Sequence, residues 1–242
     1  MVGFDRITSI MDNCVLTRRF YFGAKLDILI TIIIINSSKT YIRLIMTQAE
    51  SIKFFHEHTG LLRTKEILSA GIGPKTLYKL RDEGIIEQVS YGLYRSCESP
   101  ISEYSSYLEL TRRIPNAVFC LISALDFLSI GTQLPYEHWI TLPTGTKEPR
   151  INEYSLQFIH ATDKLYQLGI EEHVIDQVTL RFYSPAKTVV DCFKHRSKVG
   201  LEVAIEALKE SIKLKKATRK KILEYATQCR MKNVMMPYLE SL

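Results

Sequence analysis

The residues best suited to chemistry in this 242-residue chain are an acid and a base four positions apart, Asp191 and His195. On a helix this spacing places both side chains on one face, where a carboxylate can orient an imidazole that acts as a general base. A pair with this spacing is more often simply solvated. His56 and His58 are two residues apart, so a helix points them to different faces and they make poor joint metal ligands. We therefore expect a solvated Asp191–His195 pair and no metal site.

The motifs of common nucleic-acid enzymes are missing from the chain. Magnesium-dependent nucleases commonly use paired carboxylates and a lysine in the order (D/E)-x-K, and no lysine here has Asp or Glu two residues before it. A Gly-Ser turn followed by D-x-D or D-x-E, a Walker loop, G-x-S-x-G and H-E-x-x-H are also absent. The sequence therefore favours a protein that is not an enzyme and needs no cofactor. Trp139 is expected in the core.

The cysteines indicate a reducing compartment. Their number is odd and no two form a C-x-x-C pair, a pattern typical of unpaired, mostly buried thiols. We expect a cytoplasmic protein without disulfides or zinc. The five cysteines are Cys14, Cys97, Cys120, Cys192 and Cys229.

Charge is unevenly distributed along the chain. The formal net charge is +6, which favours an anionic partner without identifying it. Residues 46–99 carry 7 basic and 7 acidic residues, residues 100–183 carry 6 and 10, and residues 184–233 carry 13 and 5. The positive field is therefore expected at the C-terminal end.

Seven basic residues lie within 13 positions, at the end of one expected helix and the start of the next. Cations are favoured near a helix C-terminus, so a solvated helical hairpin is one interpretation. The cluster also suits the backbone of DNA or RNA, or an acidic protein partner. We define it as the accessory basic surface, made of Lys209, Lys213, Lys215, Lys216, Arg219, Lys220 and Lys221.

A helix expected to begin at Pro74 carries the candidate recognition face. Proline suits the first helical position because its missing N–H is not needed there, and Gly84 ends the helix. Leu77 and Leu80 share one face and predict packing against earlier helices. The opposite face carries Lys75, Tyr78, Lys79 and Asp82, with Thr76 and Arg81 on its flanks.

Two helices and a hairpin complete this segment. A run that begins at Thr47 sets Ile52 and Phe55 on one face of a first helix, and Thr64 is the expected N-cap of a second. Two short strands flank Ser90-Tyr91-Gly92, a turn in which the glycine can take a positive φ. This order of elements predicts a winged helix-turn-helix over residues 47–98.

Groove dimensions connect this fold to DNA. The major groove admits one α-helix, whose exposed side chains reach base edges. Lys75, Thr76, Tyr78, Lys79 and Arg81 are the candidates on the helix, and Tyr91 and Arg95 on the wing can contact the backbone or minor groove. Because the segment is net neutral, a protein-interaction module is the open alternative.

Residues 100–242 predict a mixed α+β domain with a helical C-terminal end. A linker helix is expected before Pro115, then a short buried strand and a helix stopped by Gly131. Further strands are expected around residues 138–143, 156–162 and 177–183. Ser184 and Pro185 open a helix as N-cap and first residue, and two more amphipathic helices follow.

Residues 1–45 are an atypical segment. The apolar run over residues 26–35 contains Asp27 and is too short for a membrane span of about 20 residues. Basic residues precede it as in a signal peptide, but no small-x-small cleavage site follows. The composition also resembles translated AT-rich noncoding DNA. We expect a mis-assigned start at Met46, with a buried strand or a membrane-associated tail as alternatives.

The chain from about Thr47 to Cys229 resembles the AbiEi-type antitoxins of bacterial abortive-infection (type IV toxin–antitoxin) systems. The matching segments are GLYR at 92–95, SALDFL...LP..HWITLP at 123–143, and LRFYSPAKTVVDCFKHRSKVGLEVAIEALKE at 180–210. The last is the most specific, with its S-P-A-(R/K)-T and G-x-(D/E)-x-A patterns. Lys187 stands where Arg is more usual, and residues 1–45 have no counterpart.

The resemblance implies a repressor of its own toxin–antitoxin operon that also neutralises a co-encoded nucleotidyltransferase toxin. Its implied partners are double-stranded operator DNA, bound by the first domain, and the toxin, met directly or indirectly through the second. It implies no catalytic residue and no membrane partner unless residues 1–45 are genuine. Two alternatives stay open: a stand-alone winged-helix regulator whose C-terminal domain senses a ligand or protein, and an enzyme acting on nucleic acid.

Overall fold

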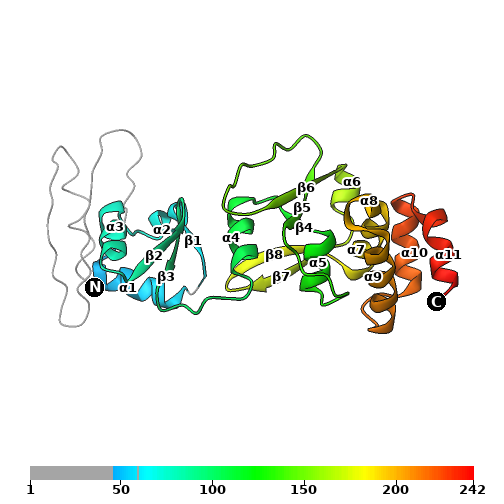
Figure 1. Cartoon of the computed structure of the whole chain (residues 1–242). Helices are drawn as coiled ribbons and strands as arrows, with labels where there is room; N and C mark the ends of the chain where they lie inside the picture. The colour runs from blue at the N-terminus through cyan, green and yellow to red at the C-terminus, as the bar shows by residue number, and fades with distance from the viewer. Residues whose placement is uncertain (1–45, 59) are drawn as a thin grey trace, which may run out of the picture. The chain divides into compact units, whose positions relative to one another are not determined.

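The computed structural model describes residues 46–58 and 60–242. The chain divides into two compact units, one ending at Ile101 and the other running from Ser102 to Leu242 (Figure 1). Within the described residues, no helix combines the length and apolarity needed to cross a membrane. The expectations for residues 1–45 lie outside this part of the chain.

The described residues of the N-terminal unit form three helices and a three-stranded antiparallel sheet in the order β1-β3-β2. Thr47 caps the first helix in a reciprocal capping box with Glu50, as a Thr-x-x-Glu sequence favours. The elements are α1 (Gln48–Glu57), β1 (Leu62–Arg63), α2 (Thr64–Ser69), α3 (Pro74–Asp82), β2 (Ile86–Ser90) and β3 (Leu93–Ser96).

The core of this unit follows the predicted helix faces. Phe55 of α1 and Leu77 and Leu80 of α3 are buried together with Ile67 and Ile86. The predicted N-cap of α2 was wrong, because the cap is Arg63 and Thr64 is the first helical residue. The Thr64 hydroxyl instead donates to the Gly92 carbonyl at 3.2 Å, which ties the start of α2 to the hairpin turn.

The second unit is built on a five-stranded mixed sheet in the order β6-β5-β4-β8-β7. Strand β4 pairs parallel with β8 and antiparallel with β5, whereas β5 pairs parallel with β6 and β7 antiparallel with β8. The strands are β4 (Val118–Phe119), β5 (His138–Pro143), β6 (Leu156–Ala161), β7 (Ile170–Ile175) and β8 (Val178–Tyr183).

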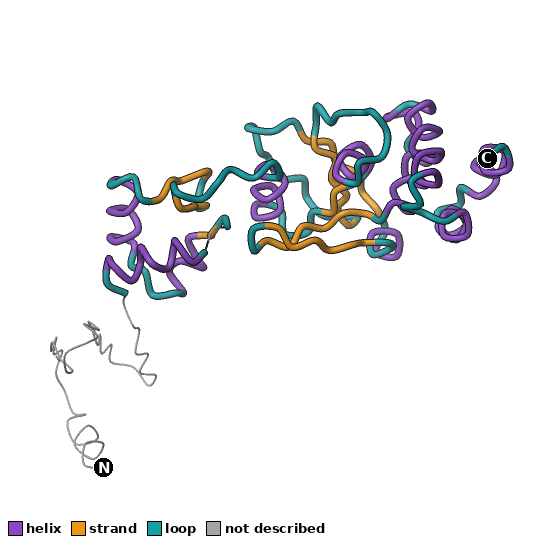
Figure 2. The backbone as a smooth tube through the Cα atoms, turned by 90° about the horizontal axis from the view of Figure 1, so that it is seen from below, coloured by secondary structure: helices purple, strands orange, loops and turns teal. Residues whose placement is uncertain are grey.

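Helices cover both faces of this sheet, with α4 on one side and α7 on the other (Figures 1 and 2). Two helices, α5 and α6, follow strands β4 and β6, and four helices follow α7 toward the C-terminus. The helices are α4 (Ser105–Arg113), α5 (Leu121–Phe127), α6 (Asp163–Tyr166), α7 (Pro185–Lys194), α8 (Arg196–Val199), α9 (Leu201–Lys213), α10 (Arg219–Gln228) and α11 (Lys232–Glu240).

The expectation that α4 is a linker was wrong. Tyr107 and Leu110 are buried, and the Tyr107 ring packs edge-on against Phe119 and Phe182 of the sheet, with ring centroids 4.8 and 5.4 Å apart. On the other face, Val189 and Val190 of α7 are buried in the same apolar core as Trp139. Apolar side chains on both faces of one sheet confirm the mixed α+β class.

Candidate nucleic-acid interface

The exposed face of α3 is the first part of the candidate interface. Leu77 and Leu80 are buried, as the helix pattern predicted, so the opposite face points to solvent. Lys75 is exposed, Thr76 is half-buried, and the Tyr78 side chain is 49% exposed. Across the described residues Lys75 has no hydrogen-bond or ion-pair partner. Its charge is therefore available to an anion.

Lys79 is exposed but already engaged within the unit. Its Nζ donates to Gln48 Oε1 of α1 at 2.7 Å and lies 3.7 Å from Glu83 Oε1. Gln48 Nε2 in turn donates to Glu83 Oε2 at 2.7 Å. This network links α1 to the end of α3. DNA would have to compete with it for Lys79.

Arg81 is paired with its neighbour in the sequence. The guanidinium donates twice to Asp82 Oδ1, at 2.8 and 3.0 Å, and hydrogen bonding to that carboxylate raises the pKa of Arg81. The guanidinium carbon lies 5.2 Å from the centre of the Tyr78 ring. Arg81 therefore supports the orientation of Tyr78 more than it offers a free charge.

The β2–β3 hairpin presents the second part of the interface. Gly92 has φ +73°, which a tight turn requires and glycine adopts without strain, and Tyr91 beside it is 97% exposed. Arg95 lies opposite Glu87 in the strand register and is hydrogen-bonded to it. Arg95 is therefore held in the sheet rather than directed outward.

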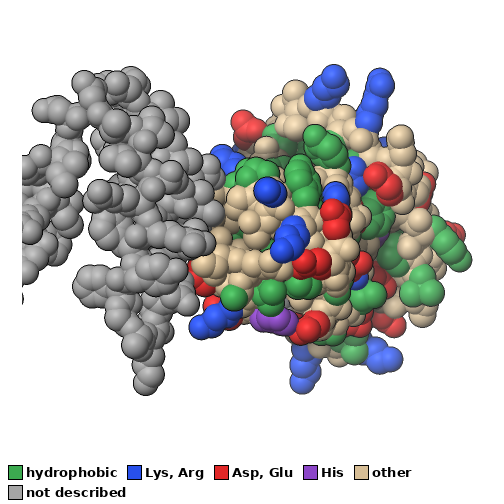
Figure 3. All heavy atoms as spheres, turned by 90° about the vertical axis from the view of Figure 1, so that its left-hand side faces the viewer, with side chains coloured by type: hydrophobic (Ala, Val, Ile, Leu, Met, Phe, Trp, Pro, Cys, Tyr) green, Lys and Arg blue, Asp and Glu red, His purple; other side chains and the backbone are tan. Residues whose placement is uncertain are grey.

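The predicted contact residues thus fall into two groups. Lys75, Thr76, Tyr78 and Tyr91 are accessible, whereas Lys79, Arg81 and Arg95 are held by neighbouring acidic or amide groups. Figure 3 shows Lys and Arg side chains scattered among Asp and Glu on the face that it draws. No dense positive patch forms on this face.

The accessory basic surface is also divided. Lys216 Nζ donates to the carbonyls of Leu128 and Ser129, and Lys221 pairs with Glu224 at 3.1 Å and lies 4.7 Å from the Tyr225 ring centre. The other members are exposed and, among the residues that the structure describes, have no ion-pair or hydrogen-bond partner for their side chains: Lys209, Lys213, Lys215, Arg219 and Lys220.

Two helices of this region end in a basic residue with left-handed backbone. Lys215 after α9 has φ +56°, and Arg230 after α10 has φ +60°. Glycine is the usual residue at such positions because other side chains add strain. Lys215 therefore combines a strained backbone with a free side-chain charge.

One comparison with known proteins concerns the segment that contains α3 and the hairpin. Residues 50–96 match the family model of AbiEi antitoxin transcriptional regulators. This match confirms the AbiEi resemblance over these residues, from within α1 to the end of β3. No curated protein matches the chain.

The fold of the chain is similar to a solved structure, the crystal structure of the RV2827C protein from Mycobacterium tuberculosis. The TM-score is 0.53 at 15% sequence identity, over 76% of this chain and 73% of that chain. At this identity the likeness concerns the fold alone. The similar fold covers more of the chain than residues 50–96, which match the AbiEi model.

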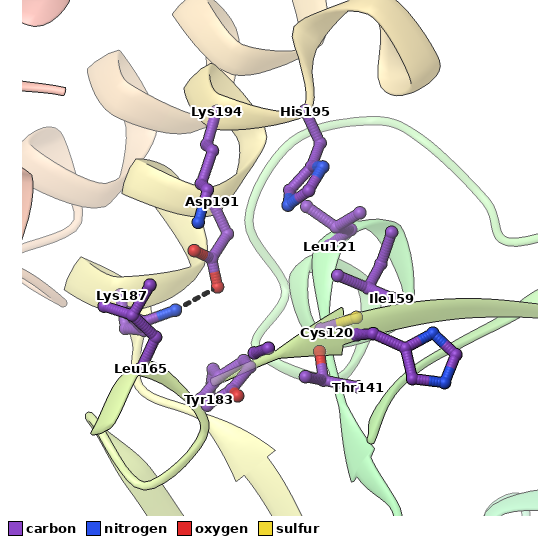
Figure 4. Close-up of a pocket in the computed structure, with 12 residues that line it drawn as sticks. Cys120, Leu121, Thr141, Ile159, Leu165, Tyr183, Lys187, Asp191, Lys194 and His195 are labelled. Atoms are coloured by element: carbon purple, nitrogen blue, oxygen red, sulfur yellow. Dashed lines mark hydrogen bonds and ion pairs between the residues drawn. The ribbon is translucent and has the colours of Figure 1, made fainter. Parts of the chain in front are cut away.

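The most specific part of the AbiEi resemblance lies outside the matched residues and contains a buried charge pair. Lys187 donates to Asp191 one turn later on α7, and their side chains are 4% and 9% exposed (Figure 4). Lys187 Nζ also lies 4.2 Å from the centre of the Tyr183 ring. The expected solvated Asp191–His195 pair was wrong, because Asp191 is buried and bonds to Lys187.

The surroundings of this pair are tightly packed. A cavity of about 20 Å3 adjoins it, enough for one water molecule. Burial raises the pKa of the Cys120 thiol to about 12, so this cysteine is a poor nucleophile. Burial also lowers the pKa of His195, against the opposing charge of Asp191. The described residues hold no group of three or more His, Cys, Asp or Glu side chains suited to a metal ion.

Proposed function

We propose that the chain is an AbiEi-type regulator that represses its own operon by binding operator DNA and counteracts a co-encoded nucleotidyltransferase toxin. The N-terminal unit supplies DNA binding as a winged helix-turn-helix, and the second unit supplies antitoxin action. The protein acts in the cytoplasm and without enzymatic activity of its own. The observation that carries the proposal is the set of accessible residues Lys75, Thr76 and Tyr78 on α3, together with the exposed hairpin residue Tyr91, inside the segment that matches the AbiEi model.

The element order supports the winged-helix assignment. Helices α2 and α3 are joined by a short turn, and the β2–β3 hairpin follows at once. In such a unit α3 is the recognition helix and the hairpin is the wing. Leu77 and Leu80 face the core, so α3 can enter a groove without disturbing the packing of the unit.

The candidate side chains are expected to contribute unequally to DNA affinity. Lys75 lies in the first turn of α3, where the helix dipole adds to its attraction for phosphate. Tyr78 and Tyr91 can hydrogen-bond to phosphate or base edges and pack against sugars. Lys79, Arg81 and Arg95 contribute less, because each must first give up a bond to Glu83, Asp82 or Glu87.

The accessory basic surface supplies the non-specific part of binding. Residues 46–99, which hold α3 and the hairpin, carry equal numbers of acidic and basic side chains, so a second source of charge is needed for strong attraction. Three free cations, Lys215, Arg219 and Lys220, lie at the start of α10 and just before it and provide it. Specific contacts from α3 and general attraction from the second unit are separate contributions to DNA binding.

The test is fluorescence anisotropy of the full chain with DNA from upstream of its gene and with a shuffled duplex, at several salt concentrations. A specific repressor binds its own site about 4 kcal/mol or more tightly than the shuffled duplex, with a steep salt dependence. Equal, weak binding to both duplexes would contradict operator recognition and make the N-terminal unit a protein-interaction module.

The antitoxin part needs a separate test. A nucleotidyltransferase gene beside this gene, whose expression stops growth, is expected to be neutralised by co-expression of the full chain. A chain that carries Lys75→Ala and Tyr78→Ala keeps this neutralisation, because antitoxin action belongs to the second unit. If no such gene is adjacent and DNA binding is specific, the alternative of a stand-alone regulator with a sensing second unit replaces the antitoxin.

A further inference from the structure

The solvent-facing side of α9 carries an ordered pattern of charge. Glu202, Glu206, Lys209 and Lys213 follow one another at spacings of four, three and four residues, which keeps them on one helix face. The opposite face is buried against the core through Ala204, Ala207, Leu208 and Ser211. The first half of the exposed row is therefore acidic and the second half basic.

This row lines a shallow hollow on the surface. Glu202, Lys209 and Lys213 are exposed, and in the part of the chain that the structure describes none of the three has an ion-pair partner. Glu206 is half-buried and accepts from the Thr132 hydroxyl at 3.0 Å. The hollow is lined by Glu202, Ile205, Glu206, Lys209, Glu210 and Lys213.

We propose that this face of α9 is the contact between two copies of the chain, packed antiparallel about a two-fold axis between residues 207 and 208. In that arrangement Glu202 lies opposite Lys213 of the second copy and Glu206 opposite Lys209 of the second copy. Each pair occurs twice, as a two-fold interface requires. The helix dipoles also favour the antiparallel direction.

The charge pattern selects a second copy over other occupants. A nucleic acid would be repelled by the three carboxylates in the hollow, Glu202, Glu206 and Glu210, and an acidic protein would be repelled in the same way. Two copies of this row place each glutamate opposite a lysine only when the two helices run antiparallel. The charges therefore specify both the partner and the direction of packing.

An apolar loop lies beside the proposed axis. The Gly131 N–H donates to Glu210 at 2.6 Å and the Thr132 hydroxyl to Glu206, so α9 holds the start of this loop near its midpoint. Leu134 and Tyr136 of the loop are 72% and 97% exposed. If the second copy also contacts these side chains, their burial adds to the stabilisation that the exposed ion pairs give.

The experiment is sedimentation equilibrium of the full chain at low salt, without DNA, so its result does not depend on the proposed function. The wild-type chain is expected to form a reversible dimer. Glu202→Lys and Lys213→Glu each replace two attractions by two repulsions and weaken the dimer about tenfold or more. The double variant restores the attraction in reversed order and returns the dimer to near wild-type strength.

Lys220→Glu is the matched control, because it reverses an exposed lysine on α10 outside the row. It leaves the dimer unchanged, and circular dichroism verifies that every variant is folded. A wild-type chain that stays monomeric at all concentrations overturns the proposal. So does equal weakening by Lys220→Glu, an unaffected dimer in the single variants, or a double variant as weak as either single one.

Discussion

Lys187 and Asp191 form an ion pair one turn apart on α7, and the rest of the second unit buries both side chains. Lys187 also rests on the Tyr183 ring, so three side chains share one enclosed site. Either charge alone is costly in the core. We therefore infer that packings of the second unit that separate the two charges are disfavoured.

Breaking this pair is expected to destabilise the second unit strongly. Lys187→Met leaves the Asp191 carboxylate buried without a partner, at a cost of about 3–5 kcal/mol in the free energy of unfolding. The double variant Lys187→Met, Asp191→Leu removes both charges and recovers most of the loss. Urea unfolding followed by fluorescence of the single tryptophan, Trp139, reports on this core. A double variant as unstable as the single one would contradict the pairing account.

Lys75 and Lys79 are expected to differ in DNA binding although they are four residues apart on one helix. Lys75→Ala removes a free cation and lowers the log–log salt slope of binding by about 0.9. Lys79→Ala lowers it by less, because Gln48 and Glu83 already hold that ammonium. Anisotropy titrations at several salt concentrations measure both slopes. Lys53→Ala on α1 is the control, and a change as large as that of Lys75→Ala would place the DNA contact elsewhere.

Gly169 is expected to tolerate alanine much less well than Gly145. Both have positive φ, at +72° and +86°. A Cβ at residue 169 would meet Lys187 Cβ at 2.9 Å and Ser184 Oγ at 3.1 Å, whereas a Cβ at residue 145 meets nothing within 4 Å. Gly145→Ala therefore costs only backbone strain, about 1–2 kcal/mol. Gly169→Ala adds overpacking of about 1–3 kcal/mol. Tryptophan-detected urea unfolding separates the two, and equal losses would contradict the crowding.

Local sequence patterns predicted the helix faces and several strands well. Leu77 and Leu80 fixed the orientation of α3, and the run His138–Pro143 is a strand with the expected bounds. Strand β7 was missed because Glu171 and Glu172 interrupt any apolar alternation, and its pairing with β8 supplies the order that its sequence lacks. Helix α11 was missed because it contains Pro237.

The candidate site was less predictable, because residues distant in the sequence decide which of its charged side chains are free to bind a partner. Arg95 is engaged only because the register of β2 and β3 places Glu87 opposite it, and Lys79 only because α1 brings Gln48 close. The Lys187–Asp191 pair did have a signal, a four-residue spacing within an apolar helix. That signal predicts an ion pair, but the burial of the pair comes from the packing of the whole second unit.

Lys215 offers a test that separates charge from backbone strain. Its φ of +56° suits glycine, so Lys215→Gly is expected to raise the free energy of unfolding by about 1 kcal/mol while removing one free cation. Lys215→Ala removes the same charge but keeps the strain, so its stability stays near that of the wild type. Both variants lower the salt slope for non-specific duplex DNA equally if the lysine charge contacts phosphate. A loss of stability in Lys215→Gly would show that the lysine side chain packs favourably, and unchanged slopes would remove Lys215 from the DNA-binding surface.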